Sequence, residues 1–174
     1  MSTHRYKVWN SPMVNTAPMV PVATGTSTKT MLQLATPSTR QITIISWGWQ
    51  IDQLPTTTLT GKIDLIEADT GATITQHVAS GLQPLLPGVP PSQLLIATTG
   101  QTGYTSSSET APTVTRTLDQ DQIDGVTYLG ASQASDEYQF LPDEREVVAV
   151  SKFLRVRATF GSSVNMLCWI VYEE

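Results

Sequence analysis

The chain has 174 residues, of which 40% are hydrophobic and 14% are charged, and its formal net charge at pH 7 is −5. This length fits one domain with one core, and the composition excludes an intrinsically disordered chain. The acidic balance and the lack of any Lys and Arg cluster exclude nucleic acid as the main partner. No apolar run approaches the roughly 20 residues that span a bilayer, so no membrane partner is expected.

The first 27 residues combine recurring apolar side chains with Pro12, Pro18 and Pro21. Repeated prolines interrupt a helix and are excluded from a central strand. We therefore predict an extended N-terminal arm over residues 1–27, which lies either along its own domain or on a neighbouring molecule. Its candidate partner contacts are Val8, Trp9, Met13, Val14, Met19 and Val20.

Three strands are predicted next, from apolar alternation bounded by turn residues. They cover Lys29–Thr36, Arg40–Ile51 and Gly61–Ala68, and the intervening residues 54–60 are predicted to form a loop. In the second strand, strict alternation puts Ile45, Trp47, Trp49 and Ile51 on one face, with Ile42 and Ile44 on the other. Gly48 between the two tryptophans indicates a bend or a bulge.

A weaker extended segment, Thr73–Ala79, precedes residues 80–112, which are rich in Gly, Pro, Ser and Thr. Within them Leu94–Ala97 is predicted to form a short edge strand. We expect a loop excursion over one end of the fold, because a structureless segment of this length is unusual in a compact domain. Binding surfaces concentrate in such loops, so residues 54–60 and 80–112 are candidates for binding a host ligand.

The last third of the chain has the clearest pattern. Strands are predicted at Pro112–Leu118, Tyr138–Leu141 and Val147–Val150, and Phe153–Phe160 alternates with period two over eight residues. Gly161-Ser162-Ser163 then leads to Val164–Tyr172, which predicts a hairpin. The fold class expected is all-β: an antiparallel two-sheet β-sandwich with jelly-roll topology, forming one domain over residues 28–174.

No metal or cofactor site is expected. His4 and His77 have no second His or Cys at metal-ligand spacing, and the single cysteine, Cys168, is predicted to be a small buried hydrophobe. Asp119, Asp121 and Asp124 depart from the spacing of a calcium-binding loop, so a solvated loop is predicted there.

No catalytic residue is assigned either. Two carboxylate pairs, Glu67 with Asp69 and Asp136 with Glu137, could in principle support glycoside hydrolysis, and His77 would have to be the base of any Ser-His-Asp triad. Each carboxylate pair lies beside a predicted turn, where acidic residues serve solubility. Trp47, Trp49 and Trp169 are assigned to the core in preference to a sugar-stacking platform, because they lie in strong strand patterns. We therefore predict that the protein is not an enzyme.

Three stretches resemble small jelly-roll proteins encoded in the structural modules of tailed bacteriophages. They are Met31-Leu32-Gln33-Leu34-Ala35-Thr36-Pro37-Ser38, Lys62-Ile63-Asp64-Leu65-Ile66-Glu67, and the ending from Lys152 to Phe160 and from Val164 to Glu173-Glu174, which together cover about half of the chain. The resemblance implies a virion protein, a capsid decoration (head cement) protein. Such a protein is made in the host cytoplasm, binds the major capsid protein on the outer surface of the phage head, and often assembles as a homotrimer.

The residue-level interpretation agrees with this expectation, because a decoration protein performs no reaction and stabilises the capsid by binding it. The expected function is stabilisation of the capsid shell, with contacts from the N-terminal arm and the loops. Removal of residues 1–22 is expected to weaken binding while the sandwich still folds. The alternative is a tail-associated or fibre-associated module of the same fold that binds a receptor glycan.

Overall fold

The computed structural model describes residues 4–12, 19–53, 59–111, 113–126 and 134–174. Their strands form two antiparallel sheets, so the predicted all-β sandwich is confirmed. The elements are β1 (Arg5–Trp9), β2 (Val22–Ala23), β3 (Lys29–Ala35), β4 (Ile42–Gln53), β5 (Leu59–Ala68), β6 (Thr73–Gln76), the short 3₁₀ helix η1 (Ala79–Gly81), β7 (Gln83–Pro84), β8 (Gly103–Ser108), β9 (Val114–Val126), β10 (Ala134–Gln139), β11 (Val147–Val148), β12 (Phe153–Phe160) and β13 (Asn165–Glu173).

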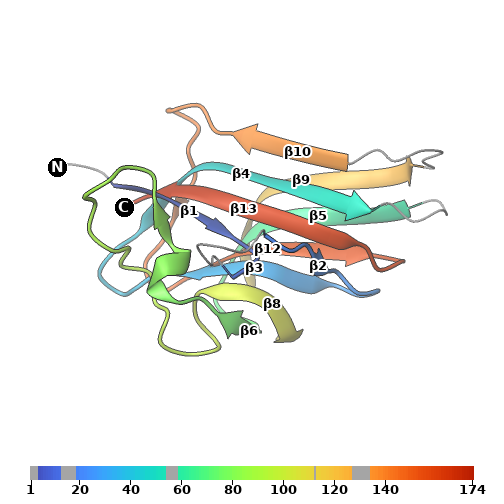
Figure 1. Cartoon of the computed structure of the whole chain (residues 1–174), viewed down its shortest axis with the longest axis horizontal. Coiled ribbons are helices and arrows are strands. Elements are labelled where there is room, and N and C mark those ends of the chain that lie inside the picture. The colour runs from blue at the N-terminus through green and yellow to red at the C-terminus, as the bar shows by residue number, and fades with distance from the viewer. Residues whose placement is uncertain (1–3, 13–18, 54–58, 112, 127–133) are drawn as a thin grey trace.

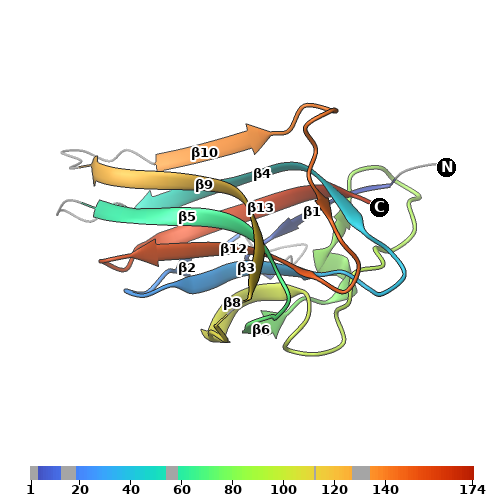
Figure 2. The ribbon, with the colours of Figure 1, turned by 180° about the vertical axis from the view of Figure 1, so that it is seen from behind.

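We call the two sheets A and B. Sheet A has the strand order β10-β4-β13-β1-β7, with β11 also paired to β4 and β2 to β13. Sheet B has the order β6-β8-β3-β12-β5-β9. In Figure 1 sheet A lies in front of sheet B, and Figure 2 shows the strands of sheet B from β9 to β8 from the other side. β1, the first strand of the described residues, pairs with the last strand, β13, so both of these strands belong to sheet A.

The core fills the space between the sheets. Sheet A contributes alternate residues of β13, namely Met166, Cys168, Ile170 and Tyr172, and sheet B contributes Leu154, Val156, Ala158 and Phe160 of β12. All eight are at most 2% exposed, which confirms the predicted alternation of Phe153–Phe160 and the prediction that Cys168 is buried. Burial of the larger apolar side chains contributes roughly 1.5–3 kcal/mol each, so this layer stabilises the packing of sheet A on sheet B.

The predicted hairpin between the last two strands is wrong. β12 pairs with β3 and β5 in sheet B, whereas β13 pairs with β4 and β1 in sheet A. Residues 161–164 therefore connect one sheet to the other. Period-two alternation marks which face of each strand is buried, and two strands that face each other across a core alternate in the same way as two strands that pair.

The face assignment of β4 is also corrected. Val171 of β13 pairs with Ser46 and Tyr172 pairs with Ile44, so the bulge lies at Ile45 and not at Gly48. The extra residue reverses the alternation, and Ile42, Ile44, Trp47, Trp49 and Ile51 all join the core, whereas Ile45 does not. The glycine at position 48 is explained by close packing, because a Cβ there would lie 2.5 Å from the ring of Trp169.

Other predicted boundaries shift. β5 begins at Leu59, inside the predicted loop 54–60, whose residues 54–58 lie outside the described part of the chain. Residues Leu94–Ala97 form no strand. β9 continues beyond Leu118 to Val126, so Asp119 and Asp121 lie in a strand and not in a solvated loop. Each carboxylate accepts a bond across the core from an indole N–H of β4, Trp47 to Asp119 at 2.9 Å and Trp49 to Asp121 at 2.6 Å.

The outer face of sheet B carries buried charge. The Arg155 side chain is fully buried, and its guanidinium donates to Glu109, to the Thr30 hydroxyl and to the Thr70 carbonyl. Two residues further along β12, Arg157 binds both carboxylate oxygens of Asp64 on β5, at 2.7 and 2.9 Å. These charges are matched by opposite charges and by hydrogen bonds, which is the condition for burying them at moderate cost.

Candidate partner-binding surface

Residues 77–102, which we call the excursion, cover the end of the sandwich where both termini lie (Figure 1). The prediction placed a loop excursion over one end of the sandwich at residues 80–112. In the structure this stretch includes η1, β7 and β8, and β8 belongs to sheet B. The excursion thus begins and ends earlier than predicted, and within it the short strand β7 pairs with β1 at the edge of sheet A.

The last residues of the chain hold the middle of the excursion in place. The Glu174 carboxylate accepts bonds from the Gln93 N–H, at 3.1 and 3.0 Å, and from the Ser92 hydroxyl at 2.6 Å. Tyr172 donates to the same Ser92 hydroxyl at 2.7 Å, and burial raises the pKa of Tyr172 well above its usual value. These bonds fix the excursion to a core strand of sheet A.

The start of the excursion is tied to β1. The Leu85 N–H donates to the Arg5 carbonyl at 2.9 Å, and the Tyr6 hydroxyl donates to the Pro90 carbonyl at 2.8 Å. His77 lies 2.8 Å from the Trp9 carbonyl through its Nε2, which must donate because a carbonyl can only accept. Burial lowers the pKa of His77, and the bond to Trp9 opposes that shift.

The end of the excursion is tied to β3. The Leu95 N–H donates to the Ala35 carbonyl at 3.0 Å, and the Thr102 hydroxyl accepts from the Ala35 N–H at 2.9 Å. The Gln33 side chain donates to the Gln101 carbonyl at 2.6 Å and accepts from the Ala72 N–H at 2.8 Å. The excursion is thus fastened at its start, middle and end by the two sheets that it covers.

Apolar side chains of this fastened segment nevertheless face solvent. Leu86 is 64% exposed, Val78 62% and Leu85 48%, while Leu82 and Leu94 of the same segment are buried in the core. Pro84 and Pro87 flank the two exposed leucines. The excursion therefore has an inner side that anchors it and an outer side that presents apolar groups.

A second segment at the same end, residues 140–152, adds to this surface. Its Ser151 N–H donates to the Pro37 carbonyl at 3.2 Å, and its Ala149 carbonyl accepts from the Thr36 hydroxyl at 2.7 Å. It is thus fastened just after the point where the excursion meets β3. Its exposed apolar side chains are those of Leu141, Val147 and Val150.

We call the exposed apolar side chains of these two segments the loop-end surface. The two segments lie at the same end of the sandwich (Figure 1 and Figure 2), and exposed apolar side chains mark an interaction site where they form one patch. A surface whose backbone is already fixed loses little conformational entropy on binding, which favours affinity. The arrangement is therefore suited to binding a protein partner through apolar contacts.

The predicted contact residues of the N-terminal arm have different outcomes. Val8 is fully buried in the core as part of β1, so its assignment as a contact is wrong. Trp9 packs on Trp169 with ring centroids 4.8 Å apart, and the Lys7 ammonium lies 4.4 Å from the Trp9 ring centroid. Residues 5–9 thus lie along their own domain, and removing residues 1–22 would delete a core strand.

The remaining arm residues are less constrained. Val20 is 63% exposed, and Met19 is partly exposed. Met13 and Val14 lie outside the described residues. Met19 and Val20 therefore stay candidates for partner contact.

Three of the four carboxylates that were considered for catalysis bind other side chains of the chain. Glu67 binds Arg116 at 2.8 Å, and Asp69 pairs with Lys152. Burial raises the pKa of Glu67. The hydrogen bonds from Arg116 and Thr115 and the charge of Arg116 lower this pKa by a larger amount, so the net pKa lies below the usual value. Asp136 and Glu137 are adjacent on β10, where they point to opposite faces, and Glu137 accepts from Ser46 and Trp169. Trp169 lies on the outer face of sheet A, unlike Trp47 and Trp49, which are in the core as predicted.

The described residues contain no group of three or more His, Cys, Asp or Glu side chains placed to hold a metal ion. They also contain no helix that is both long and apolar enough to cross a membrane.

The apolar contacts of the loop-end surface were not singled out from the sequence. The signal was the pair Leu85-Leu86 between two prolines, a setting that prevents both residues from being hidden in a helix or a central strand. Comparisons of the chain with protein-family models, with curated proteins and with solved structures gave no match.

Proposed function

We propose that this chain is a non-enzymatic virion structural protein, a decoration protein that binds the outer surface of a phage head and stabilises the capsid shell. The observation that carries the proposal is the loop-end surface, in which a firmly held excursion exposes Leu85 and Leu86. Its partner is the major capsid protein, and its location is the outside of the virion after synthesis in the host cytoplasm. The resemblance of the three sequence stretches to phage structural proteins supports the same proposal.

The jelly-roll topology is part of this proposal, and the strand order supports it. Eight strands in chain order, β1, β3, β4, β5, β9, β10, β12 and β13, are divided between sheet A as β1-β13-β4-β10 and sheet B as β3-β12-β5-β9. The first pairs with the last, the second with the seventh, and the third with the last. This nesting of an early strand beside a late one is what two interlocked Greek keys produce.

Binding to the assembled shell, and not to its dissociated subunits, would stabilise the shell by mass action. A homotrimer fits this function, because a closed ring of three chains can contact neighbouring capsomers with three copies of one surface. Met19 and Val20 are candidates for a second contact from the arm.

The test is cosedimentation of the purified chain with capsids assembled from the major capsid protein encoded in the same structural module. We expect saturable binding at a fixed stoichiometry and capsids that survive a higher temperature when decorated. Capsids that neither bind the chain nor gain heat resistance would contradict the proposal.

A further inference from the structure

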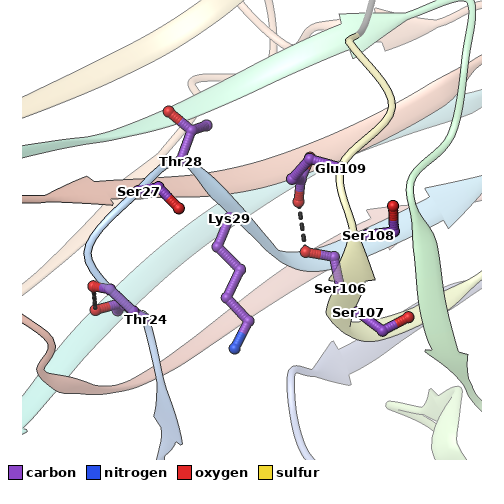
Figure 3. Close-up of a pocket in the computed structure, with 9 residues that line it drawn as sticks. Thr24, Ser27, Thr28, Lys29, Ser106, Ser107, Ser108 and Glu109 are labelled. Carbon is purple, nitrogen blue, oxygen red and sulfur yellow. Dashed lines mark hydrogen bonds between the residues drawn. The ribbon is translucent and has the colours of Figure 1, made fainter.

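A pocket opens where two neighbouring strands of sheet B separate. β8 pairs with β3 only at Leu32–Tyr104 and Gln33–Gly103, and beyond these pairs the two strands diverge. The divergence begins at Thr105, whose φ of 54° and shifted register against β6 mark a bulge. The resulting pocket has a volume of about 280 Å³ and lies between residues 24–29 and 106–109 (Figure 3).

Polar side chains line this pocket. Its walls carry six hydroxyl groups, one ammonium and one carboxylate; the lining residues are Thr24, Gly25, Ser27, Thr28, Lys29, Ser106, Ser107, Ser108 and Glu109. None of these nine has an aromatic or aliphatic side chain. A ligand held here would therefore be polar and would be recognised by hydrogen bonds rather than by stacking.

The two charged groups of the pocket are not equivalent. Glu109 is neutralised by the buried Arg155, and it also accepts bonds from the Thr30 N–H and the Ser106 hydroxyl. Lys29 donates to the Ala23 carbonyl at 2.7 Å, a neutral partner that uses one of its three N–H donors. Burial lowers the pKa of Lys29, and the nearby Glu109 charge opposes that shift.

The pocket thus carries a cation whose hydrogen-bonding capacity is not used up, in a chain whose net charge is −5. An anionic group at Lys29 would accept hydrogen bonds from this partly buried ammonium, which burial has deprived of some of its water. Serine hydroxyls can donate to the same anion. The hydroxyls of Thr24, Ser106 and Ser107 already donate to oxygens of the chain, and that of Thr28 bonds the Thr159 hydroxyl. Their oxygens can still accept a bond from a sugar hydroxyl, because a hydroxyl oxygen has two lone pairs.

We propose that this pocket binds one acidic sugar residue, with the carboxylate on Lys29 and the sugar hydroxyls on the serine and threonine side chains. The volume agrees with one residue, since pockets for larger, drug-sized ligands measure roughly 300–1,000 Å³. β8 runs from the excursion toward the opposite end of the sandwich (Figure 1), so the pocket lies away from the loop-end surface. The inference does not depend on the capsid proposal.

The test is an NMR titration of the intact chain with glucuronate, with glucose as the uncharged match. Glucuronate should shift the amide signals of residues 24–29 and 106–109 with an affinity of roughly 1 mM, and glucose should bind at least about tenfold more weakly. Raising the salt concentration should weaken glucuronate binding, because the contact with Lys29 is ionic.

Substitutions sharpen the titration. Lys29→Met keeps the aliphatic stem and should reduce glucuronate affinity at least about tenfold, whereas Lys29→Arg keeps the charge and should retain most of it. Lys62→Met removes the same charge from β5 and should leave the affinity unchanged. An NMR spectrum of each variant without ligand shows whether the fold is intact.

Three results would overturn the inference. One is the lack of any glucuronate-induced shift at residues 24–29 and 106–109. Another is equal binding by the wild-type chain and a folded Lys29→Met variant. The third is binding of inorganic phosphate at these residues without binding of glucuronate, which would show recognition of a bare oxyanion instead of a sugar.

Discussion

The outer face of sheet B and the loop-end surface differ in which side chains they bury: the first buries a charged group, and the second leaves apolar groups exposed. On sheet B, even the charged Arg155 is fully buried, and Glu109, Thr30 and Thr70 supply its bonds. At the loop end, Leu85 and Leu86 stay in solvent although the backbone around them is fixed. A chain that covers an arginine completely has the means to cover two leucines. Under the capsid-binding proposal, the difference separates a surface that stabilises the fold from a surface that binds the partner.

The largest effect should come from sheet B. Arg155→Ala leaves Glu109 without its buried partner, and loss of one member of such a pair costs about 3–5 kcal/mol. The melting temperature should fall by at least about 6 °C. Arg5→Ala, which breaks a pair in which the Arg5 side chain is 49% exposed, is the matched control and should cost no more than about 1 kcal/mol. Similar losses for both variants would remove the contrast between the two surfaces.

Next in size is the effect of the loop end on binding. The double substitution Leu85→Asp with Leu86→Asp should weaken capsid binding by roughly 10- to 100-fold, because buried apolar anchors dominate interface energies. The free energy of unfolding should change by less than about 0.5 kcal/mol, as for other exposed positions. Val114→Asp, at a position that is 42% exposed on β9 and lies outside both segments, is the control for apolar exposure elsewhere. Undiminished cosedimentation of the double variant would rule out the loop-end surface as the contact.

Loss of the fastening at the excursion should have a smaller, local effect. Glu174→Ala removes the acceptor for Gln93 and Ser92, and the loss of such bonds costs about 1–2 kcal/mol. Hydrogen exchange of residues 92–95 should become faster, while exchange in β12 should stay unchanged. Equal protection of residues 92–95 in both proteins would show that the C-terminus does not hold the excursion.

The pH dependence of the free energy of unfolding tests the burial of His77. Because burial lowers the pKa of His77 in the folded protein, the unfolded chain binds more protons below about pH 6.5, and stability is lost as the pH falls through that value. The slope from one such group is at most about 1.4 kcal/mol per pH unit. Denaturant unfolding at pH 7.5 and 5.5 should show a smaller loss for His77→Gln than for the wild type. Equal losses in both proteins would mean that His77 does not contribute.

The smallest effect should be a gain. Thr105 is β-branched and has a φ of 54°, in the left-handed region that such residues avoid, and its buried hydroxyl has no hydrogen-bond partner among the residues that the structure describes. Thr105→Asn should therefore raise stability by up to about 1 kcal/mol, since Asn adopts this conformation more readily. A lower melting temperature would show that the threonine methyl group contributes more than the strain costs.

Alternation in the sequence correctly placed Leu154, Val156, Ala158 and Phe160 on one face of a strand, but it assigned the faces of β4 wrongly. It could not predict pairing, because residues 153–160 and 165–173 alternate in the same way in two sheets as they would in one hairpin. The bulge at Ile45 was hidden for a related reason, since it exists only in the register against Val171 and Tyr172.

The candidate sites were predicted only as regions. The composition of residues 80–112 indicated a loop that could bind a partner, but the exposure of Leu86 follows from bonds to β1, β3 and Glu174, which are distant in sequence. The hydroxyl-lined pocket depends on the divergence of β8 from β3, which no local pattern encodes. The only sign of this pocket in the sequence was the run of three serines, Ser106-Ser107-Ser108.

The most direct test of the central claim is electron cryo-microscopy of capsids decorated with this chain. The account predicts density on the outer surface of the shell in which residues 77–102 and 140–152 face the capsid protein and the pocket at residues 24–29 and 106–109 faces solvent. A decorated particle in which the loop-end surface points away from the shell would contradict it, as would a particle on which the chain occupies no defined position.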